Sequence, residues 1–141
     1  MKGKFEMTDS KLLKLALEAR EHAYIPYSNF AVGAALLAKS GKVYTGCNIE
    51  SATHTPTCCA ERTAFFKAVS EGEREFERIA VVGAKGGSTP TELCPPCGVC
   101  RQVMREFCDD DFVIVLGTPD DVHTYTLAEI LPLGFSGKNI Q

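Results

Sequence analysis

The sequence predicts an α/β fold in which helices flank a mixed β-sheet of about five strands. Two observations support it. Runs of apolar and β-branched residues alternate with segments of helical periodicity, and several strands are separated by helix-length segments that allow parallel pairing. We find no linker that divides the chain, so residues 1–141 are expected to form a single domain.

The first element is a helix predicted over residues 8–23. Leu12, Leu13 and Leu17 recur near helical spacing behind three residues whose types often cap helix N-termini, Thr8, Asp9 and Ser10. Pro26 disfavours helical geometry at the residue before it, so the helix should end by that point.

A hairpin follows the first helix. Apolar and β-branched runs over 30–39 and 42–49 flank Ser40 and Gly41, a pair typical of tight turns. The sequence therefore predicts two antiparallel strands here, followed by a polar loop that begins with Asn-Ile-Glu.

The rest of the chain alternates helices and strands, with breaks at glycine and proline. We expect a helix at 59–72, a strand at 76–84, a helix at 97–107, strands at 112–117 and 123–126, and a helical turn at 127–131. The helices lie between strands, which predicts crossover connections.

The overall composition excludes several classes of function. The chain has 45% hydrophobic and 23% charged residues, which is ordinary for a globular protein of 141 residues. Its net charge of -3 argues against binding nucleic acid, and no apolar run is long enough to span a membrane. The N-terminal ten residues show no secretory or transit signal, so we expect a cytoplasmic protein.

The chain has an odd number of cysteines, seven. They are Cys47, Cys58, Cys59, Cys94, Cys97, Cys100 and Cys108. Cytoplasmic thiols are normally reduced, so metal binding or catalysis is favoured over a disulfide framework.

The stretch CPPCGVCRQ contains a candidate metal-binding pair. Cys97 and Cys100 are three residues apart at the start of a predicted helix, so both thiols can point at one atom. A helix N-terminus also favours the thiolate form, and Gly98 would allow a close backbone approach. Cys94 precedes two prolines and belongs to the loop, with a redox pairing to Cys97 as its alternative.

A second helix start carries the same kind of residue. Cys59 opens the predicted helix at 59–72, with Glu61 and Arg62 close behind it. Three thiolates would leave the fourth tetrahedral position of a zinc ion open, which is typical of catalytic zinc. Glu61 would then move protons, while Arg62 and the two helix N-termini would draw negative charge from the sulfurs.

Other interpretations of these residues remain open. A structural zinc site would need a fourth ligand, which Cys58 or His54 could supply. A redox module using Cys94 and Cys97 would make Glu61 dispensable. An enzyme acting on a polynucleotide would need a basic groove, which the net charge of -3 disfavours.

Taken together, these stretches resemble the small homotetrameric zinc-dependent cytidine deaminases. The resemblance covers almost the whole chain, through YIPYSNFAVGAAL, CNIESA, CCAERTAFFKAVSEG, PCGVCRQVMREF and LAEILPLGF. It includes the pattern of a cysteine two residues before a glutamate, followed by Pro-Cys-x-x-Cys. It implies a three-layer cytidine-deaminase-like fold, one Zn²⁺ per subunit, and deamination of cytidine and deoxycytidine in pyrimidine salvage. A homotetramer with shared active sites would follow.

The resemblance also assigns roles to individual residues. The zinc ligands would be Cys59, Cys97 and Cys100, with Glu61 as proton carrier. The residues that contact the nucleoside would be Phe30, Asn48, Glu50, Ala60 and Phe135. Asn48 and Glu50 would hold the ribose hydroxyls, Phe30 would line the pocket, and Ala60 would offer its main chain to the base. Phe135 would reach the base from a neighbouring subunit.

Two positions depart from the family pattern. Pro95 stands where a small hydroxyl residue is usual, so a hydrogen-bond donor is lost, and His54 stands where a tyrosine is usual. The related blasticidin S deaminases share the zinc pattern but lack the Asn-Ile-Glu triplet, which favours a free unmodified nucleoside here. A modified cytosine nucleoside is the alternative substrate. We find no glycine-rich loop for ATP or NAD.

Overall fold

The computed structural model describes residues 6–141 of the protein. The helices are α1 (Asp9–Arg20), α2 (Ala60–Ser70), α3 (Gly98–Phe107), α4 (Leu127–Ile130) and a 3₁₀ turn, η2 (Gly137–Ile140). The strands are β1 (Phe30–Ala38), β2 (Val43–Cys47), β3 (Phe76–Lys85), β4 (Val113–Thr118) and β5 (Asp121–Thr126). Within the described part, we find no helix with the length and apolar character needed to cross a membrane.

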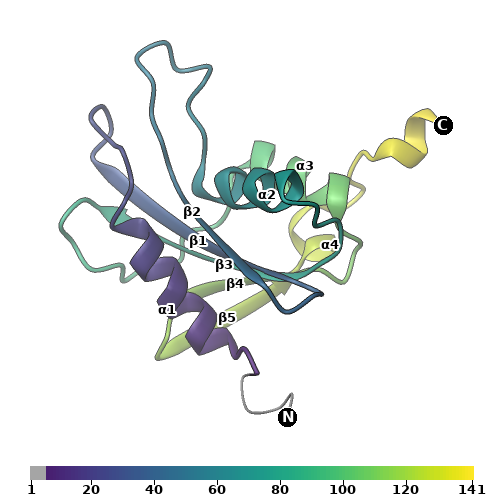
Figure 1. Ribbon diagram of the computed structural model, residues 1–141, viewed down its shortest axis with the longest axis horizontal. Helices are drawn as coiled ribbons and strands as arrows, with labels where there is room; N and C mark the ends of the chain where they lie inside the picture. Colours follow the sequence, from purple (N-terminus) through teal and green to yellow (C-terminus); the bar gives the residue numbers. More distant parts are fainter. Residues whose placement is uncertain (1–5) are drawn as a thin grey trace.

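The strands form one mixed sheet in the order β2-β1-β3-β4-β5 (Figure 1). Neighbouring strands are antiparallel except β3 and β4, which run parallel. The parallel pair requires a crossover, and α3 supplies it. The predicted mixed five-stranded sheet is therefore confirmed.

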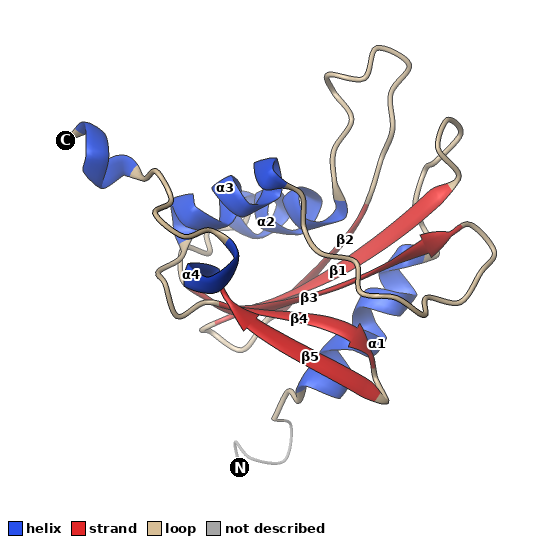
Figure 2. Ribbon diagram, turned by 180° about the vertical axis from the view of Figure 1, so that it is seen from behind, coloured by secondary structure: helices blue, strands red, loops and turns tan. Residues whose placement is uncertain are grey.

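Helices cover both faces of the sheet. α1 lies on one face, while α2, α3 and α4 lie on the other (Figures 1 and 2). Side chains alternate along β1, so Ala34 and Leu36 pack beneath α2 whereas Ala35 and Leu37 pack against α1. The alternation explains why a nearly continuous apolar run forms a central strand with two buried faces.

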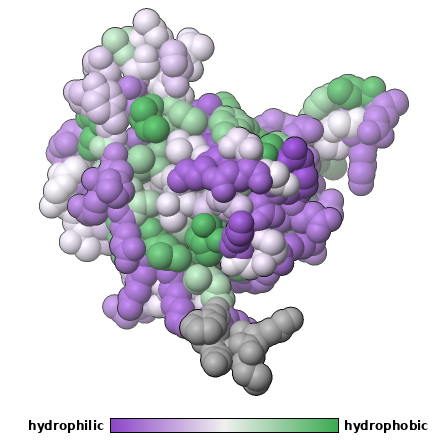
Figure 3. All heavy atoms as spheres, in the orientation of Figure 1, coloured by the Kyte–Doolittle hydropathy of each residue, from purple (hydrophilic) through white to green (hydrophobic). Residues whose placement is uncertain are grey.

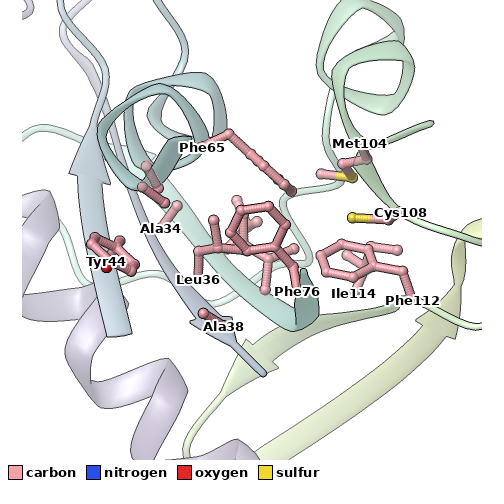
Figure 4. Close-up of a cluster of buried hydrophobic side chains, with 14 of the residues drawn as sticks. Ala34, Leu36, Ala38, Tyr44, Phe65, Phe76, Met104, Cys108, Phe112 and Ile114 are labelled. Carbon is pink, nitrogen blue, oxygen red and sulfur yellow. The ribbon is translucent and has the colours of Figure 1, made fainter. Parts of the chain in front are cut away.

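The core beneath α2 and α3 is built around an aromatic cluster (Figure 4). The ring of Phe65 from α2 meets that of Phe76 edge to face at 5.1 Å and lies 6.0 Å from those of Phe107 and Phe112. Pairs of this kind stabilise a fold beyond their buried area. The aromatic layer thereby fixes α2, whose N-terminus carries the first candidate ligand, against the sheet.

The first helix begins as predicted but ends early. The Thr8 hydroxyl accepts a hydrogen bond from the main chain of Lys11, which confirms the N-terminal cap. The helix ends at Arg20 because the chain after it pairs with the segment that follows β2: the N–H of Tyr24 donates to the carbonyl of Asn48. A long-range contact overrides the local helical periodicity.

The hairpin turn is at the predicted place, and its second strand is shorter than predicted. Gly41 adopts a φ of 97°, a left-handed conformation that glycine accepts without strain. β2 ends at Cys47, two residues early, because the side chain of Asn48 turns to bond with β1. The 3₁₀ turn η2 was not predicted.

Candidate active site

Both helices that carry candidate ligands begin at a cysteine. Cys59 is the N-cap of α2 and Cys97 is the N-cap of α3, and neither side chain makes a capping hydrogen bond. Both thiols therefore remain free to bind another group. Cys100, in the first turn of α3, is fully buried, so its thiol points into the protein near the other two.

The three sulfur atoms converge. The Sγ atoms of Cys59 and Cys97 are 3.9 Å apart, and the three sulfurs of Cys59, Cys97 and Cys100 lie within 4.8 Å of one another. Tetrahedral zinc with Zn–S bonds of about 2.3 Å places its sulfur ligands roughly 3.8 Å apart. The spacing and the soft thiol donors fit a zinc ion.

The cluster has three members in the part of the chain that the structure describes. Neither Cys58 nor His54, the two residues considered as a fourth ligand, belongs to it. Three protein ligands leave one tetrahedral position open to a small molecule. The arrangement has the form of a catalytic zinc site.

The expected close approach at Gly98 is wrong. A Cβ atom added at Gly98 would meet no atom within 4 Å. A close approach of this kind occurs instead between β2 and the start of α2, where a Cβ atom added at Gly46 would lie 2.5 Å from the carbonyl oxygen of Ala60. The absent side chain of Gly46 lets α2 lie directly on the sheet.

Glu61 is buried beside the thiols. It lies in the first turn of α2, two residues after Cys59, and its side chain is 4% exposed. The pKa of Glu61 is raised to about 7, mainly by burial and also by the negative charge of Cys59, while its own main-chain N–H and Arg62 act in the opposite direction. A carboxyl with a pKa near neutrality can both accept and donate a proton at cellular pH.

Arg62 and Cys100 stabilise the Cys59 thiolate. The hydrogen bond from Cys100 lowers the pKa of Cys59 to about 5, and Arg62 contributes through Nη2, 3.3 Å from the Cys59 Sγ. The same hydrogen bond, together with burial, raises the pKa of Cys100. The guanidinium of Arg62 therefore lies against the Cys59 sulfur, where a positive charge favours the thiolate.

The remaining cysteines lie apart from this cluster. Cys108 is buried in the core below α3, and burial raises its pKa to about 12, which keeps the thiol protonated and inert. Burial also raises the pKa of Cys94 to about 11. Both act as small apolar packing residues.

Asn48 and Glu50 are held by the segment that leads into β1. Asn48 donates from Nδ2 to the carbonyl of Phe30 at 2.8 Å and accepts at Oδ1 from the N–H of Val32 at 2.9 Å. Glu50 accepts from the N–H groups of Tyr27 and Ser28 at 3.0 and 3.1 Å. The Asn-Ile-Glu triplet is thereby tied to the start of β1.

The surroundings of Glu50 form a small pocket of about 220 Å³. Its lining residues are Tyr27, Ser28, Glu50, Ser51, His54 and Thr57. The hydroxyl of Ser28 also donates to Glu50 and lowers the pKa of its carboxyl, which therefore stays ionised as a hydrogen-bond acceptor.

Sequence analysis did not assign roles to Tyr27 and Ser28. Both lie 22 or 23 residues before Glu50 in the chain, so helical or strand periodicity could not relate them to it. The only sequence signal was their place in the stretch YIPYSNF, next to Phe30.

Phe30 lies on the face of the sheet that α2 covers. A Cβ atom added at Gly83 of β3 would lie 3.1 Å from Cε2 of Phe30 and 2.6 Å from Sγ of Cys94. The missing side chain at Gly83 therefore makes room for the ring and the thiol together. The ring remains 41% exposed and can contact a ligand.

Phe135 lies beyond α4, in the last part of the chain. It lies in the C-terminal segment, which projects from the opposite end of the molecule to the loop that joins β2 to α2 (Figures 1 and 2). Its ring is 58% exposed, and its carbonyl accepts a hydrogen bond of 2.7 Å from Gln102 of α3. The other predicted site residues lie at the beginnings of β1 and α2, at the end of β2 and in α3.

Comparisons with known proteins agree with this geometry. The family model described as the cytidine and deoxycytidylate deaminase zinc-binding region matches residues 6–116. The chain is 47% identical over 135 residues to a cytidine deaminase of Sporosarcina psychrophila, covering 95% of this chain and 96% of that one. It is 30% identical over 131 residues to a blasticidin-S deaminase of Bacillus cereus, with coverage of 91% and 92%.

The fold is shared with solved structures of the same family. A crystal structure of cytidine deaminase from Burkholderia pseudomallei superimposes with a TM-score of 0.82 at 46% identity. The match covers 92% of this chain and 100% of the other. From the site geometry, the matched family model and the extent of these matches, we conclude that the chain belongs to the cytidine deaminase family.

Proposed function

We propose that the protein catalyses the hydrolytic deamination of cytidine and deoxycytidine to uridine and deoxyuridine with release of ammonia. One observation carries the proposal. A buried carboxyl, Glu61, lies two residues from a cluster of three thiols that has the spacing of zinc ligands and an open fourth position. A metal ion held by such a cluster would have an open position next to a group that can accept a proton.

Cys59, Cys97 and Cys100 would hold one Zn²⁺ per chain. When bound, the ion supplies a Lewis acid that lowers the pKa of a coordinated water toward neutrality. Arg62 would offset part of the negative charge of three thiolates, since its guanidinium already contacts the Cys59 sulfur.

Glu61 is the group that would move protons. It would accept one proton from the attacking water and pass it to N3 of the pyrimidine as oxygen adds at C4. It would then take the second proton from the new C4 hydroxyl and give it to the departing amino group, which leaves as ammonia. One carboxyl thus acts first as a base and later as an acid. Its pKa of about 7 suits both roles near neutral pH.

The residues around the start of β1 would bind the nucleoside. Phe30 would form a wall against the ring, while Asn48 and Glu50 would hold the ribose hydroxyls and the main chain of Ala60 would face the base. The carboxylate of Glu50 is suited to accept from a hydroxyl because its three hydrogen bonds keep it ionised and oriented.

The C-terminal segment suggests how an assembly could complete the site. Leu133, Phe135 and Ile140 are exposed on this segment, and Figure 3 shows apolar residues on its outer side. Apolar side chains on a projecting arm suit burial against another subunit. We therefore include a homotetramer with shared active sites in the proposal, together with a single domain over residues 1–141 and a cytoplasmic role in pyrimidine salvage.

The test compares the wild type with Glu61→Gln. Both proteins are assayed with cytidine and deoxycytidine by the loss of pyrimidine absorbance, and zinc content is measured on both. We expect one zinc per chain in each protein and turnover in the wild type alone, because glutamine keeps the shape but cannot shuttle protons. Zinc-loaded wild type with no activity on either nucleoside would contradict the proposal.

A modified cytosine nucleoside is the second candidate substrate, because the chain also matches a blasticidin-S deaminase. The same assay with blasticidin S separates the two. A kcat/KM for blasticidin S above that for cytidine would reverse the order of the candidates.

A further inference from the structure

Arg20 is a buried cation on the face of the sheet remote from the thiols. It is the last residue of α1 and is 7% exposed. Its Nε donates to the carbonyl of Ala31 at 2.9 Å, and its Nη2 donates to the carbonyls of Ala84 and Lys85 at 3.0 and 2.7 Å. Within residues 6–141, no carboxylate lies at salt-bridge distance from it.

This arrangement requires α1 to lie unusually close to β1. A Cβ atom added at Gly33 would lie 2.0 Å from the carbonyl oxygen of Ala16 and 2.9 Å from Cβ of Arg20. The bare backbone of Gly33 therefore lets the end of α1 rest on the strand. The guanidinium can then reach the two strand ends nearest the candidate site.

The carbonyls that Arg20 binds lie next to Phe30, the residue proposed to form one wall of the nucleoside pocket. Ala31 follows Phe30 at the start of β1, and Ala84 pairs with Ala31 across the strand pair. Asn48 holds the flanking groups, the carbonyl of Phe30 and the N–H of Val32. Three consecutive residues are thus fixed, by Arg20 at the middle one and by Asn48 at the outer two.

The ring of Phe30 points away from Arg20 into the site. Successive residues of a strand face opposite sides, and Val32 packs with the core beneath α2. Phe30 therefore faces the thiols, which agrees with its position over Gly83. A shift of the main chain at Ala31 would move the ring of Phe30 with it.

We propose that Arg20 is a positioning residue for the deaminase reaction: it holds the start of β1 so that the ring of Phe30 forms the wall of the nucleoside pocket. This inference rests on the proposed function. Burying a cation costs free energy because the charge loses its contact with water, and an apolar side chain would not carry this cost. We infer that the benefit is the fixed geometry that the guanidinium imposes on the three carbonyls.

The test uses zinc-loaded Arg20→Met, with Arg78→Met as its matched control. Arg78 bonds Asp9 at the other end of α1 at 2.6 Å, so its loss loosens the same helix without touching residues 30–32. We expect Arg20→Met to raise the KM for cytidine about tenfold with kcat changed less than threefold, which is the size of one aromatic contact. Arg78→Met should leave both constants unchanged.

The division between KM and kcat separates positioning from folding. A variant that is partly unfolded loses active molecules, which lowers the apparent kcat and leaves KM unaltered. A folded Arg20→Met with the wild-type KM would overturn the proposal. Should Arg20→Met fail to fold, Arg20→Lys replaces it. Lysine keeps the charge but cannot donate to the three carbonyls in the fixed geometry of the guanidinium, so KM should still rise, and a folded Arg20→Lys with the wild-type KM would overturn the proposal.

A double-mutant cycle tests whether Arg20 acts through Phe30. Phe30→Leu alone should raise KM, and adding Arg20→Met to it should raise KM less than twofold further. Fully additive effects would show that Arg20 does not act through the ring and would overturn the inference.

Amide hydrogen exchange gives a readout that needs no substrate. Exchange at Ala31 and Val32 should accelerate in Arg20→Met and not in Arg78→Met, because the main chain there loses its clamp. Unchanged exchange at these amides would contradict the clamp itself. A wild type that is inactive on cytidine, with accelerated exchange in Arg20→Met, would instead reject the proposed function and with it the role of Arg20 in nucleoside binding.

Discussion

Arg20 and Glu61 are both charged and buried, yet their environments differ. Arg20 is the last residue of α1 and donates to three main-chain carbonyls, whereas Glu61 lies in the first turn of α2, where burial raises the pKa of its carboxyl. Buried charges are stable when their hydrogen bonds are satisfied. The guanidinium of Arg20 makes hydrogen bonds that fix the main chain around it. The carboxyl of Glu61 lies beside the thiols, where it can exchange protons with a ligand.

The largest effect should come from removing a thiol next to Glu61. We expect Cys100→Ala to lose its zinc on dialysis and its activity by about 1000-fold or more, because a metal supplies several kcal/mol to the transition state. Zinc analysis and initial rates check this. The control is Cys58→Ala, which lies outside the cluster and should retain zinc. Loss of zinc from Cys58→Ala would show that Cys58 also binds the metal.

The pH dependence of stability should sharpen the contrast. In the metal-free protein, the pKa of Glu61 is raised from 4.5 to about 7, so the folded state binds this proton more tightly than the unfolded state. Its favourable contribution is therefore present below pH 4.5 and is lost as pH rises through about 7. Glutamine does not titrate, so Glu61→Gln should not lose stability in this way as the pH rises.

We expect metal-free Glu61→Gln to gain about 3 kcal/mol of unfolding free energy relative to the wild type between pH 4 and pH 8. Urea denaturation of both proteins across this range measures it. A difference between the two proteins that stays constant with pH would mean that Glu61 is not buried as a neutral acid.

Loss of the Arg20 charge should act in the opposite direction. Arg20→Met removes the donor to one buried and two partly buried main-chain carbonyls, so we expect about 2–3 kcal/mol of destabilisation by urea denaturation. Arg78→Met breaks a partly exposed ion pair and should cost less than about 1 kcal/mol. Equal losses in the two variants would remove the distinction between the buried and the surface arginine.

The smallest effect should come from Arg62. Arg62→Gln keeps a donor near the Cys59 sulfur but removes the positive charge, so the thiolates hold their full negative charge. We expect kcat to fall about tenfold with zinc retained, the usual scale for residues that support metal ligands. Zinc loss without a change in the kcat of the loaded fraction would assign Arg62 to metal retention instead.

The sequence alone was sufficient to place each thiol of the cluster at the start of a helix. Cys59 and Cys97 stand at helix starts, and Cys100 shares a helix face with Cys97, so local rules of capping and periodicity bring each thiol to an N-terminus. The strands were equally clear, since β-branched residues and alternation are local signals. The mixed sheet followed from the order of elements.

The tertiary structure decided what long-range contacts control. Arg20 lies 11 residues from Ala31 and 64 from Ala84, and no periodicity connects these positions. An arginine at a helix end is usually exposed, and only the packing of α1 on the sheet shows that this one is buried. The hydrogen bonds from Tyr27 and Ser28 to Glu50 have the same origin. Such contacts depend on how α1, the β1 segment and the β2–α2 loop pack in space, and the local sequence does not encode that packing.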